Sequence, residues 1–191
     1  TYNGLRGTSG DGNRTLWNTS ISYPLMGSYW FITPKITYSL THYNDIKHAR
    51  AEIDKSSTRS LPIYSLDTGL IFERNSMVFG RETEQTLEPR LFYAYIPYRN
   101  QRHMPNFDSS SADLNFAELF TPNKYTGYDR IANTNQLSAV LTTRYIDSGT
   151  GKEWFSATVG QRYYFTDEKV DLYWSNPGKT KNRSDVLAAS Q

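Results

Sequence analysis

The sequence predicts an all-β fold, an antiparallel segment of about seven strands from a larger transmembrane β-barrel. Three observations support this fold class. Long stretches alternate apolar and polar residues, short connections alternate with long ones, and 15% of the residues are aromatic although only 37% are hydrophobic. Barrels reconcile these two percentages, because only every second strand residue must face lipid and Tyr and Trp collect at the membrane interfaces. A soluble β-sandwich is the alternative fold class.

Residues 86–98 are the clearest strand. One row consists of Leu, Pro and Tyr, and the other row carries Glu88 and Arg90, which is the two-residue period of a strand. This strand has roughly 12 residues, against 5–6 in most globular proteins. Pro89 and Pro97 lie on its apolar row, as do Pro34 and Pro62 in other strands. Because Pro removes a ladder donor, these positions predict local weakening of the sheet or strand ends.

The other expected strands follow at regular spacing. They cover residues 14–25, 29–43, 61–74, 133–146 and 153–165, with a last strand cut short in 184–191. Short connections lie at 26–28, 75–81 and 147–151, and long polar ones at 44–60, 99–132 and 166–183. In outer-membrane barrels the short turns face the periplasm and the long loops face outside. About seven strands are too few for a barrel, and the chain shows no signal peptide. We therefore interpret residues 1–191 as an internal fragment of one outer-membrane β-barrel domain.

The connection 99–132 differs from the other loops, and we expect it to fold inward. Loops of more than about 15 residues are usually functional or disordered. Aromatic side chains argue against disorder here. They are Phe107, Phe116, Phe120, Tyr125 and Tyr128. The apolar spacing within 111–120, after a run of serines, predicts a helical stretch.

No motif predicts catalysis, a metal site or a cofactor. The chain has no Cys, so it can hold neither a disulfide nor a thiolate metal site, and it lacks the zinc-protease and nucleotide-binding motifs. A barrel lipase could use Ser39 with His42, but their opposite parity places them on opposite faces of a strand. His48 and His103 lie in loops, with no carboxylate or hydroxyl residue at a motif spacing in the sequence. A net charge of +2 is too small to favour nucleic acid. We expect no enzyme activity.

Two sets of strand residues are candidate functional surfaces. The polar rows are expected to form a charged wall that faces the lumen. This wall contains Lys35, Asp67, Glu73, Glu88, Arg90, Arg144 and Arg162. Its charges either handle an amphiphile with phosphates or pair across neighbouring strands and hold the barrel open. The apolar rows are expected to face lipid. They contain Trp30, Ile32, Ile36, Tyr38, Leu66, Leu70, Phe72, Leu91, Tyr93, Tyr95, Leu141 and Val159.

Several motifs resemble one known family in order along the chain. They are FITPKITYSLTHY (31–43), PIYSLDTGLIFER (62–74), QTLEPRLFYAYIPYRNQ (85–101), PNFDSS (105–110), GYDRIANTNQLS (127–138), LTTRY (141–145) and VGQRYYF (159–165). The family is LptD, also called OstA or Imp, which assembles lipopolysaccharide. The combination of LEPR, PYRNQ and DRI with NQ is the specific part. The resemblance is weak before residue 31 and after residue 165.

The resemblance implies a very large single-chain barrel in the Gram-negative outer membrane, plugged by the lipoprotein LptE. Lipopolysaccharide would reach it through periplasmic bridge proteins and a periplasmic domain, and would leave into the outer leaflet between the first and last strands. Those parts would lie outside this segment. The loop 99–132 would contact the plug. Its expected contact residues are Pro105, Asn106, Phe107, Asp108, Phe116, Phe120, Tyr128, Asp129 and Arg130. An open porin or solute channel, whose long loop narrows the pore, is the alternative function, and a barrel enzyme acting on lipid is the third.

Overall fold

The computed structural model describes residues 2–7, 10–47, 53–78, 80–172 and 182–191. These residues form one antiparallel sheet with the strand order β1-β2-β4-β5-β7-β8-β9-β10, while β3 pairs with β4 and β6 pairs with β7. The strands are β1 (Tyr2–Gly7), β2 (Gly10–Ser22), β3 (Leu25–Met26), β4 (Trp30–Lys47), β5 (Ser57–Leu70), β6 (Phe72–Val78), β7 (Arg81–Ile96), β8 (Thr134–Asp147), β9 (Glu153–Tyr164) and β10 (Leu187–Ser190). The predicted fold class is confirmed. Within the described residues the sheet is not closed on itself.

The expected strands are all present, but several boundaries differ. The predicted connection 75–81 is wrong, because β6 and β7 stay paired from Phe72↔Leu87 to Val78↔Arg81. The predicted connection 44–60 is too long, since β4 runs to Lys47 and β5 begins at Ser57. In both stretches the backbone stays paired, although apolar and polar side chains no longer alternate along the sequence. β1 had no counterpart among the expected strands.

Prolines mark two interruptions of the ladders. The pairing of β5 with β7 ends at Gly69↔Arg90 and resumes between β6 and β7 at Phe72↔Leu87, which leaves Pro89 at the gap. Pro89 has no N–H to donate to the ladder at this position. On the other side of the strand, the N–H of Ile71 donates to the Tyr29 carbonyl at 2.8 Å. β7 ends at Ile96, directly before Pro97. Pro34 and Pro62, in contrast, lie within continuous pairing of β4 and β5.

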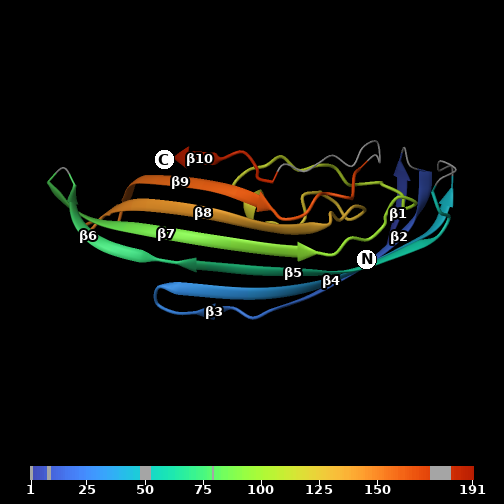
Figure 1. Ribbon diagram of the computed structural model, residues 1–191, viewed down its shortest axis with the longest axis horizontal. Helices are drawn as coiled ribbons and strands as arrows, with labels where there is room; N and C mark the ends of the chain where they lie inside the picture. Colours follow the sequence, from blue (N-terminus) through green and yellow to red (C-terminus); the bar gives the residue numbers. More distant parts are fainter. Residues whose placement is uncertain (1, 8–9, 48–52, 79, 173–181) are drawn as a thin grey trace.

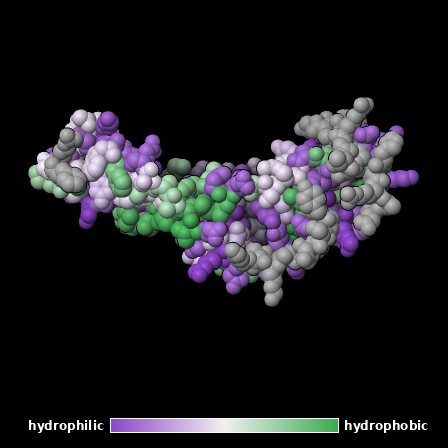
Figure 2. Space-filling model, turned by 90° about the horizontal axis from the view of Figure 1, so that it is seen from above, coloured by the Kyte–Doolittle hydropathy of each residue, from purple (hydrophilic) through white to green (hydrophobic). Residues whose placement is uncertain are grey.

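The two faces of the sheet differ in chemistry. One face is packed under residues 97–133 and is called the loop-covered face below. The opposite, bare face exposes large apolar side chains, among them Ile36 and Phe72, each 53% exposed. Figure 2 shows hydrophobic side chains gathered towards the middle of the molecule, between hydrophilic ends. In Figure 1 the short turns lie at one end of the sheet and the long loops at the other.

The buried core lies between the sheet and its long loops. It consists of small clusters, one of which joins Tyr43 and Ile46 of β4 to Met104 of the loop. A second joins Leu61 of β5 to Ile96 of β7 and to Ile131 near β8. The core therefore exists because the loop folds back on its own sheet. No helix among the described residues is long and apolar enough to cross a membrane.

Candidate functional site on the loop-covered face

The carboxylate of Asp129 holds the loop to the sheet. Asp129 is 0% exposed, and its Oδ1 accepts hydrogen bonds from Arg14 Nη1 at 2.8 Å and Tyr43 Oη at 2.7 Å. Its Oδ2 accepts from the backbone N–H groups of Phe107 at 2.6 Å and Asp108 at 2.8 Å. Four donors therefore stabilise a charge that has lost its water. Through them, one loop residue is bound to β2 and to β4.

A buried arginine of β5 also binds this part of the loop. The contacts around Asp129, including those of this arginine, are called the anchor below. Arg59 is 2% exposed, and its Nη1 donates to the Asp129 carbonyl at 2.6 Å and to Gln101 Oε1 at 2.8 Å. Its Nη2 donates to the Tyr128 carbonyl at 2.7 Å. The Gln101 side chain also binds the backbone of Ile131. Its Nε2 donates to the Ile131 carbonyl at 2.7 Å, and its Oε1 accepts from the Ile131 N–H at 3.2 Å. The two ends of the loop are thereby fixed to each other and to β5.

Arg130 ties the loop to itself. Its guanidinium is buried and donates to the carbonyls of Met104 at 2.8 Å and Pro105 at 2.9 Å. Burial lowers the pKa of Arg130. Because these partners are carbonyls rather than carboxylates, Arg130 acts as a structural brace between the two sides of the loop.

Asp108 lies at the edge of the same anchor. Burial favours a higher pKa, but the Tyr128 N–H at 3.0 Å and Arg14 at 2.8 Å hold the pKa of Asp108 below its usual value. The backbone approach is close, since a Cβ at Gly127 would lie 2.4 Å from the Asp108 carbonyl oxygen. Gly127 also has a φ of +70°, so this turn requires glycine.

The tip of the loop, the 3₁₀ turn Glu118–Phe120, is held separately, on β7. The Phe120 ring lies over the guanidinium of Arg90, with 3.8 Å between Cζ and the ring centroid. Arg90 is held in a bidentate pair with Asp67, at 2.9 and 2.6 Å. The Phe120 ring also meets Phe92 edge to face at 6.2 Å. A positioned cation and an aromatic edge thus fix the ring from two sides.

A glycine on β9 makes room for the next contact of the tip. Leu119 is fully buried, and a Cβ at Gly160 would lie only 2.7 Å from its Cδ1. Beside it, the buried Arg162 donates to the Glu118 carbonyl and to Ser138 Oγ at 3.2 Å. The loop therefore spans the sheet from β2 to β9.

A recess of about 360 Å³ opens beside the tip on the same face. Aromatic rings of Phe31, Phe116 and Phe120 line it together with Arg90 and Arg144. The recess combines an apolar wall with Arg90 and the ion pair of Arg144 and Glu88.

The structure places all seven charges of the predicted wall on the loop-covered face, and it pairs most of them. Asp67 pairs with Arg90, and Arg144 Nε lies 3.4 Å from Glu88 Oε1. Arg162 is buried under the loop, while Lys35 and Glu73 are exposed. Cross-strand pairing therefore accounts for four of these charges.

The predicted plug-contact residues divide into three groups. Pro105, Phe107, Asp108, Asp129 and Arg130 belong to the anchor around Asp129. Asn106 stays within the loop, where its side chain exchanges hydrogen bonds with the backbone of Ser109. Phe116, Phe120 and Tyr128 remain at least partly exposed. Contact with a plug stays a prediction for all nine.

The predicted helix within 111–120 is wrong. Only Glu118–Phe120 form one short 3₁₀ turn, whose Glu118 N–H is bonded by Asn115 Oδ1 at 3.0 Å. Ser111 is extended and bridges Tyr125. The apolar spacing serves packing on the sheet, which has overridden the local propensity.

Four residues of the anchor were missing from the expected site. They are Arg14, Tyr43, Arg59 and Gln101. Gln101 stands in the PYRNQ motif and Asp129 in the DRI motif, so the most specific motifs did mark the anchor. Nothing in the sequence links them to Arg14, which lies 115 residues from Asp129.

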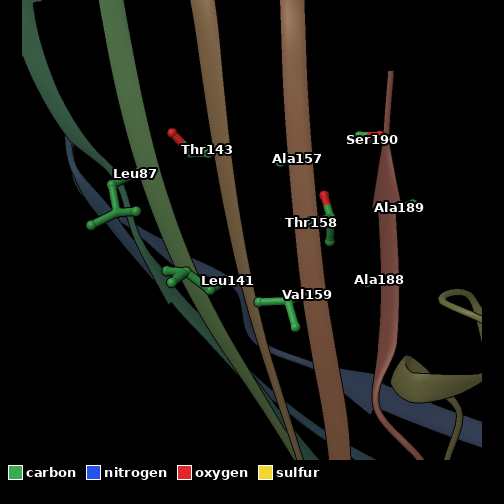
Figure 3. A pocket seen from close by; sticks show the side chains of 9 residues that line it. All are labelled: Leu87, Leu141, Thr143, Ala157, Thr158, Val159, Ala188, Ala189 and Ser190. Carbon is green, nitrogen blue, oxygen red and sulfur yellow. The ribbon is translucent and has the colours of Figure 1, made fainter.

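The bare face has a recess of its own between β7 and β10. Figure 3 shows Leu87, Leu141 and Val159 in a row beside the small residues Ala157 and Ala188. Its volume is about 430 Å³, and its walls carry no charged side chain. The twelve residues expected to face lipid share this bare face, and all but Trp30 are at least 36% exposed.

Comparison with known proteins gives one consistent result. The family model described as LptD, LPS transport system D, matches residues 3–191. An "LPS-assembly protein LptD" of Paraburkholderia xenovorans is 42% identical over 99% of the chain and 25% of the relative. That of Burkholderia thailandensis is 42% identical over 97% and 24%, and that of Aromatoleum aromaticum is 46% identical over 94% and 22%. The chain spans about a quarter of the length of these relatives.

Proposed function

The chain belongs to the LptD family, and we propose that it forms a section of the wall of an outer-membrane barrel that assembles lipopolysaccharide at the cell surface. The observation that carries the proposal is the division of the sheet into a bare apolar face and a loop-covered polar face. An outer-membrane barrel needs this division, with lipid outside and a polar interior.

The bare face is the surface that meets lipid. Its apolar rows end towards the short turns in an aromatic group, where the Tyr145 ring lies 5.5 Å from Trp154 and 5.8 Å from Phe155. A polar chain follows on the same row, from Arg74 Nε to Gln85 Oε1 at 2.7 Å and from Gln85 Nε2 to Tyr145 Oη at 2.8 Å. Arg74, Gln85, Tyr145 and Phe155 lie opposite one another across the sheet, so one level carries both aromatic and polar groups. Amphipathic aromatic residues collect at membrane interfaces. We place the periplasmic interface at this level.

The loop-covered face is the lumen wall, and the loop is the seat of a plug lipoprotein such as LptE. The polar groups around Asp129 and the Phe120 ring already make contacts within the protein. The exposed ring of Tyr128 and the half-buried ring of Phe116 are the surfaces left for a partner. We therefore assign plug contact to these two rings and a supporting role to Phe107, Asp108, Asp129 and Arg130.

The mechanism of this section is positional and includes no chemical step. The loop connects β7 to β8 and is hydrogen-bonded to β2, β4 and β5 on one side and to β9 on the other. Its position over the sheet is therefore fixed. The loop leaves a defined path along the wall, past Lys35 and the recess with Arg90 and Arg144. Arg90 and Arg144 pair with Asp67 and Glu88, whereas the exposed Lys35 suits the phosphates of lipopolysaccharide. The driving energy comes from elsewhere in the assembly.

Photo-crosslinking in living cells, with the full-length protein, tests the proposal. Probes replace Phe116 on the loop, Lys35 on the loop-covered face and Tyr93 on the bare face. Phe92 is unsuitable because it is 5% exposed and lies under Phe120. We expect lipoprotein adducts at Phe116, lipopolysaccharide or lipoprotein adducts at Lys35, and neither at Tyr93. No adduct at either lumen-side probe, together with high ion conductance of the purified protein, would instead identify an open channel.

A further inference from the structure

Tyrosines of the bare face mark its end nearest the long loops. Tyr64 and Tyr95 lie opposite each other on β5 and β7, with ring centroids 6.3 Å apart. The hydroxyl of Tyr93 donates to Asn135 Oδ1 at 2.9 Å, and Asn135 lies opposite Tyr95, nearer the long loops than Tyr93. An amphipathic ring at a membrane interface turns its hydroxyl towards water. These tyrosines therefore mark the membrane interface on the long-loop side.

The aromatic residues at the two ends of the bare face are separated by the height of a membrane. Near the short turns, Tyr145 lies opposite Gln85 of β7. Tyr95 lies ten residues from Gln85 along the same strand. At about 3.3 Å per residue and a strand tilt of about 40°, this separation gives about 25 Å, the height of the apolar band of an outer-membrane barrel. The bare face thus spans the whole apolar layer of the bilayer.

An arginine lies on the bare face at the outer end of this band. Arg183 pairs with Tyr163 of β9 in an isolated antiparallel bridge, and residues opposite each other in such a pair share one face. Both side chains are exposed. Tyr163 lies eight residues along β9 from Phe155, which belongs to the aromatic group near the short turns. This separation corresponds to about 20 Å of membrane height at the same tilt, so Arg183 lies just inside the outer boundary of the band.

The backbone beside Arg183 is fixed, but its charge has no carboxylate partner in the described part of the chain. The N–H of Ser184 donates to the Arg162 carbonyl at 2.8 Å, and Ser184 Oγ accepts from the Arg162 N–H at 3.0 Å. The ion pairs between described residues do not include Arg183. A charged side chain in a lipid-facing row is costly unless it reaches water or an anion at the interface. The position of Arg183 therefore requires an anion from outside these residues.

A second cation lies beyond the tyrosines on the same side of the sheet. The N–H of Lys169 donates to Asn133 Oδ1 at 2.7 Å, and Asn133 directly precedes β8, nearer the long loops than Asn135. Lys169 Nζ lies 5.8 Å from the centroid of the Tyr98 ring. No carboxylate of the described ranges forms an ion pair with Lys169. Two cations thus lie at successive heights, one at the boundary of the band and one above it.

We propose that Arg183 and Lys169 bind the phosphate groups of a lipopolysaccharide molecule in the outer leaflet. The inference rests on the proposed function, which places the long loops at the cell surface where this lipid is delivered. A guanidinium binds phosphate oxygens bidentately, and the exposed ring of Tyr163 offers an apolar surface to acyl chains. Two cations at different heights favour lipopolysaccharide, which carries more than one phosphate, over a phospholipid.

The site is confined to the β9 end of the bare face. Along the row that contains Tyr163, the next residues are Leu137 of β8, Tyr93 of β7 and Leu66 of β5. These side chains carry no charge that could hold a phosphate. A retained glycolipid is therefore expected beside Arg183, and the absence of an adduct at Tyr93 remains the expected result.

Titration of the purified full-length protein, together with its plug, tests the proposal. The probe is diphosphorylated lipid A in detergent, and native mass spectrometry counts the bound molecules. We expect Arg183→Gln to lower the affinity for this probe by about tenfold, because a charge-assisted contact with phosphate is lost. Lys169→Gln should have a smaller effect, and Arg183→Lys should keep part of the affinity. Lys152→Gln, in the exposed turn between β8 and β9, is the matched control and should leave the affinity unchanged.

Two other lipids identify the ligand. The parent protein should bind dephosphorylated lipid A and phosphatidylglycerol about tenfold more weakly than the diphosphorylated probe. Equal affinity for either of them would refute the assignment to lipopolysaccharide phosphates.

Unchanged affinity of Arg183→Gln would also refute the inference. A lower unfolding temperature of that variant would then assign the guanidinium to a carboxylate elsewhere in the full-length chain. Lipoprotein adducts at Phe116 alongside such a result would leave the proposed function standing, so the two failures are distinguishable.

Discussion

Asp129→Asn is the sharpest perturbation of the loop, because it keeps the shape of the side chain. Oδ1 accepts from Arg14 and Tyr43, and Oδ2 accepts from two backbone N–H groups. Whichever way the amide of Asn is oriented, its NH₂ group faces two of these donors. The variant therefore loses the charge and two hydrogen bonds, and leaves the Arg14 guanidinium buried without its carboxylate partner at this position.

The size of the effect follows from these contacts. Hydrogen bonds to charged groups contribute roughly 1.5–3 kcal/mol each, and breaking a buried ion pair by removing one partner costs roughly 3–5 kcal/mol. Two hydrogen bonds at the lower value give about 3 kcal/mol, which is also the lower end of the range for the ion pair. This loss would raise the equilibrium population of the undocked loop by about 100-fold, at about 1.4 kcal/mol per factor of ten.

Limited proteolysis of the full-length protein in detergent measures this population through the rate of cleavage within 99–132. Cleavage of a transiently opened segment follows its opening equilibrium. We expect much faster cleavage for Asp129→Asn than for the parent protein. Asp113→Asn is the matched control, since it removes an exposed carboxylate from the same loop. Equal cleavage rates for Asp129→Asn and the control would refute the role of Asp129 as the anchor.

Three other perturbations test neighbouring contacts. Gly160→Ala places a Cβ against Leu119 Cδ1 and should destabilise the docked tip by about 1–3 kcal/mol. Adding Leu119→Ala should relieve part of this cost, which denaturant titration of loop docking would show. Arg90→Lys loses the bidentate pair with Asp67 and the flat contact with Phe120, so it should speed hydrogen exchange at 118–121, whereas an unchanged rate would show that charge alone suffices. Because the folded-state pKa of Asp108 is depressed, its contribution is present at neutral pH and is lost as pH falls below about 4 through that folded value. The protection factors of the amides within 105–110, which correct for the intrinsic pH dependence of exchange, should therefore fall in acid, and Asp108→Asn should weaken that pH dependence.

The fold could be predicted from the sequence where one face of a strand is apolar. In residues 29–43 and 86–98, apolar and polar side chains alternate so regularly that a strand can be predicted without knowing which strand it pairs with. Pro89 and Pro97 also marked real interruptions, because a missing N–H acts locally. The end of β6 could not be predicted, since residues 75–78 lie in an extended hairpin without an apolar row.

Only the loop residues of the anchor could be predicted from the sequence, for a different reason. Its loop residues stand in recognisable motifs, but Arg14 and Arg59 join it through contacts that only the completed sheet creates. Local patterns carry no information about which polar residue of a distant strand will lie beneath a loop. The helix expected within 111–120 failed in the same way, because packing of these apolar side chains on the sheet leaves only the short 3₁₀ turn of Glu118–Phe120.

The span of the anchor also constrains the order of folding. Arg14, Tyr43 and Arg59 must be brought side by side by the pairing of β2, β4 and β5 before Asp129 can find its donors. Contacts across such a long stretch of chain form late, since every intervening turn must close first. The loop thus has no docking surface until the strands beside it are in register. A chain with a slipped strand would keep residues 99–132 undocked, accessible to proteases and unable to present Phe116 and Tyr128 together.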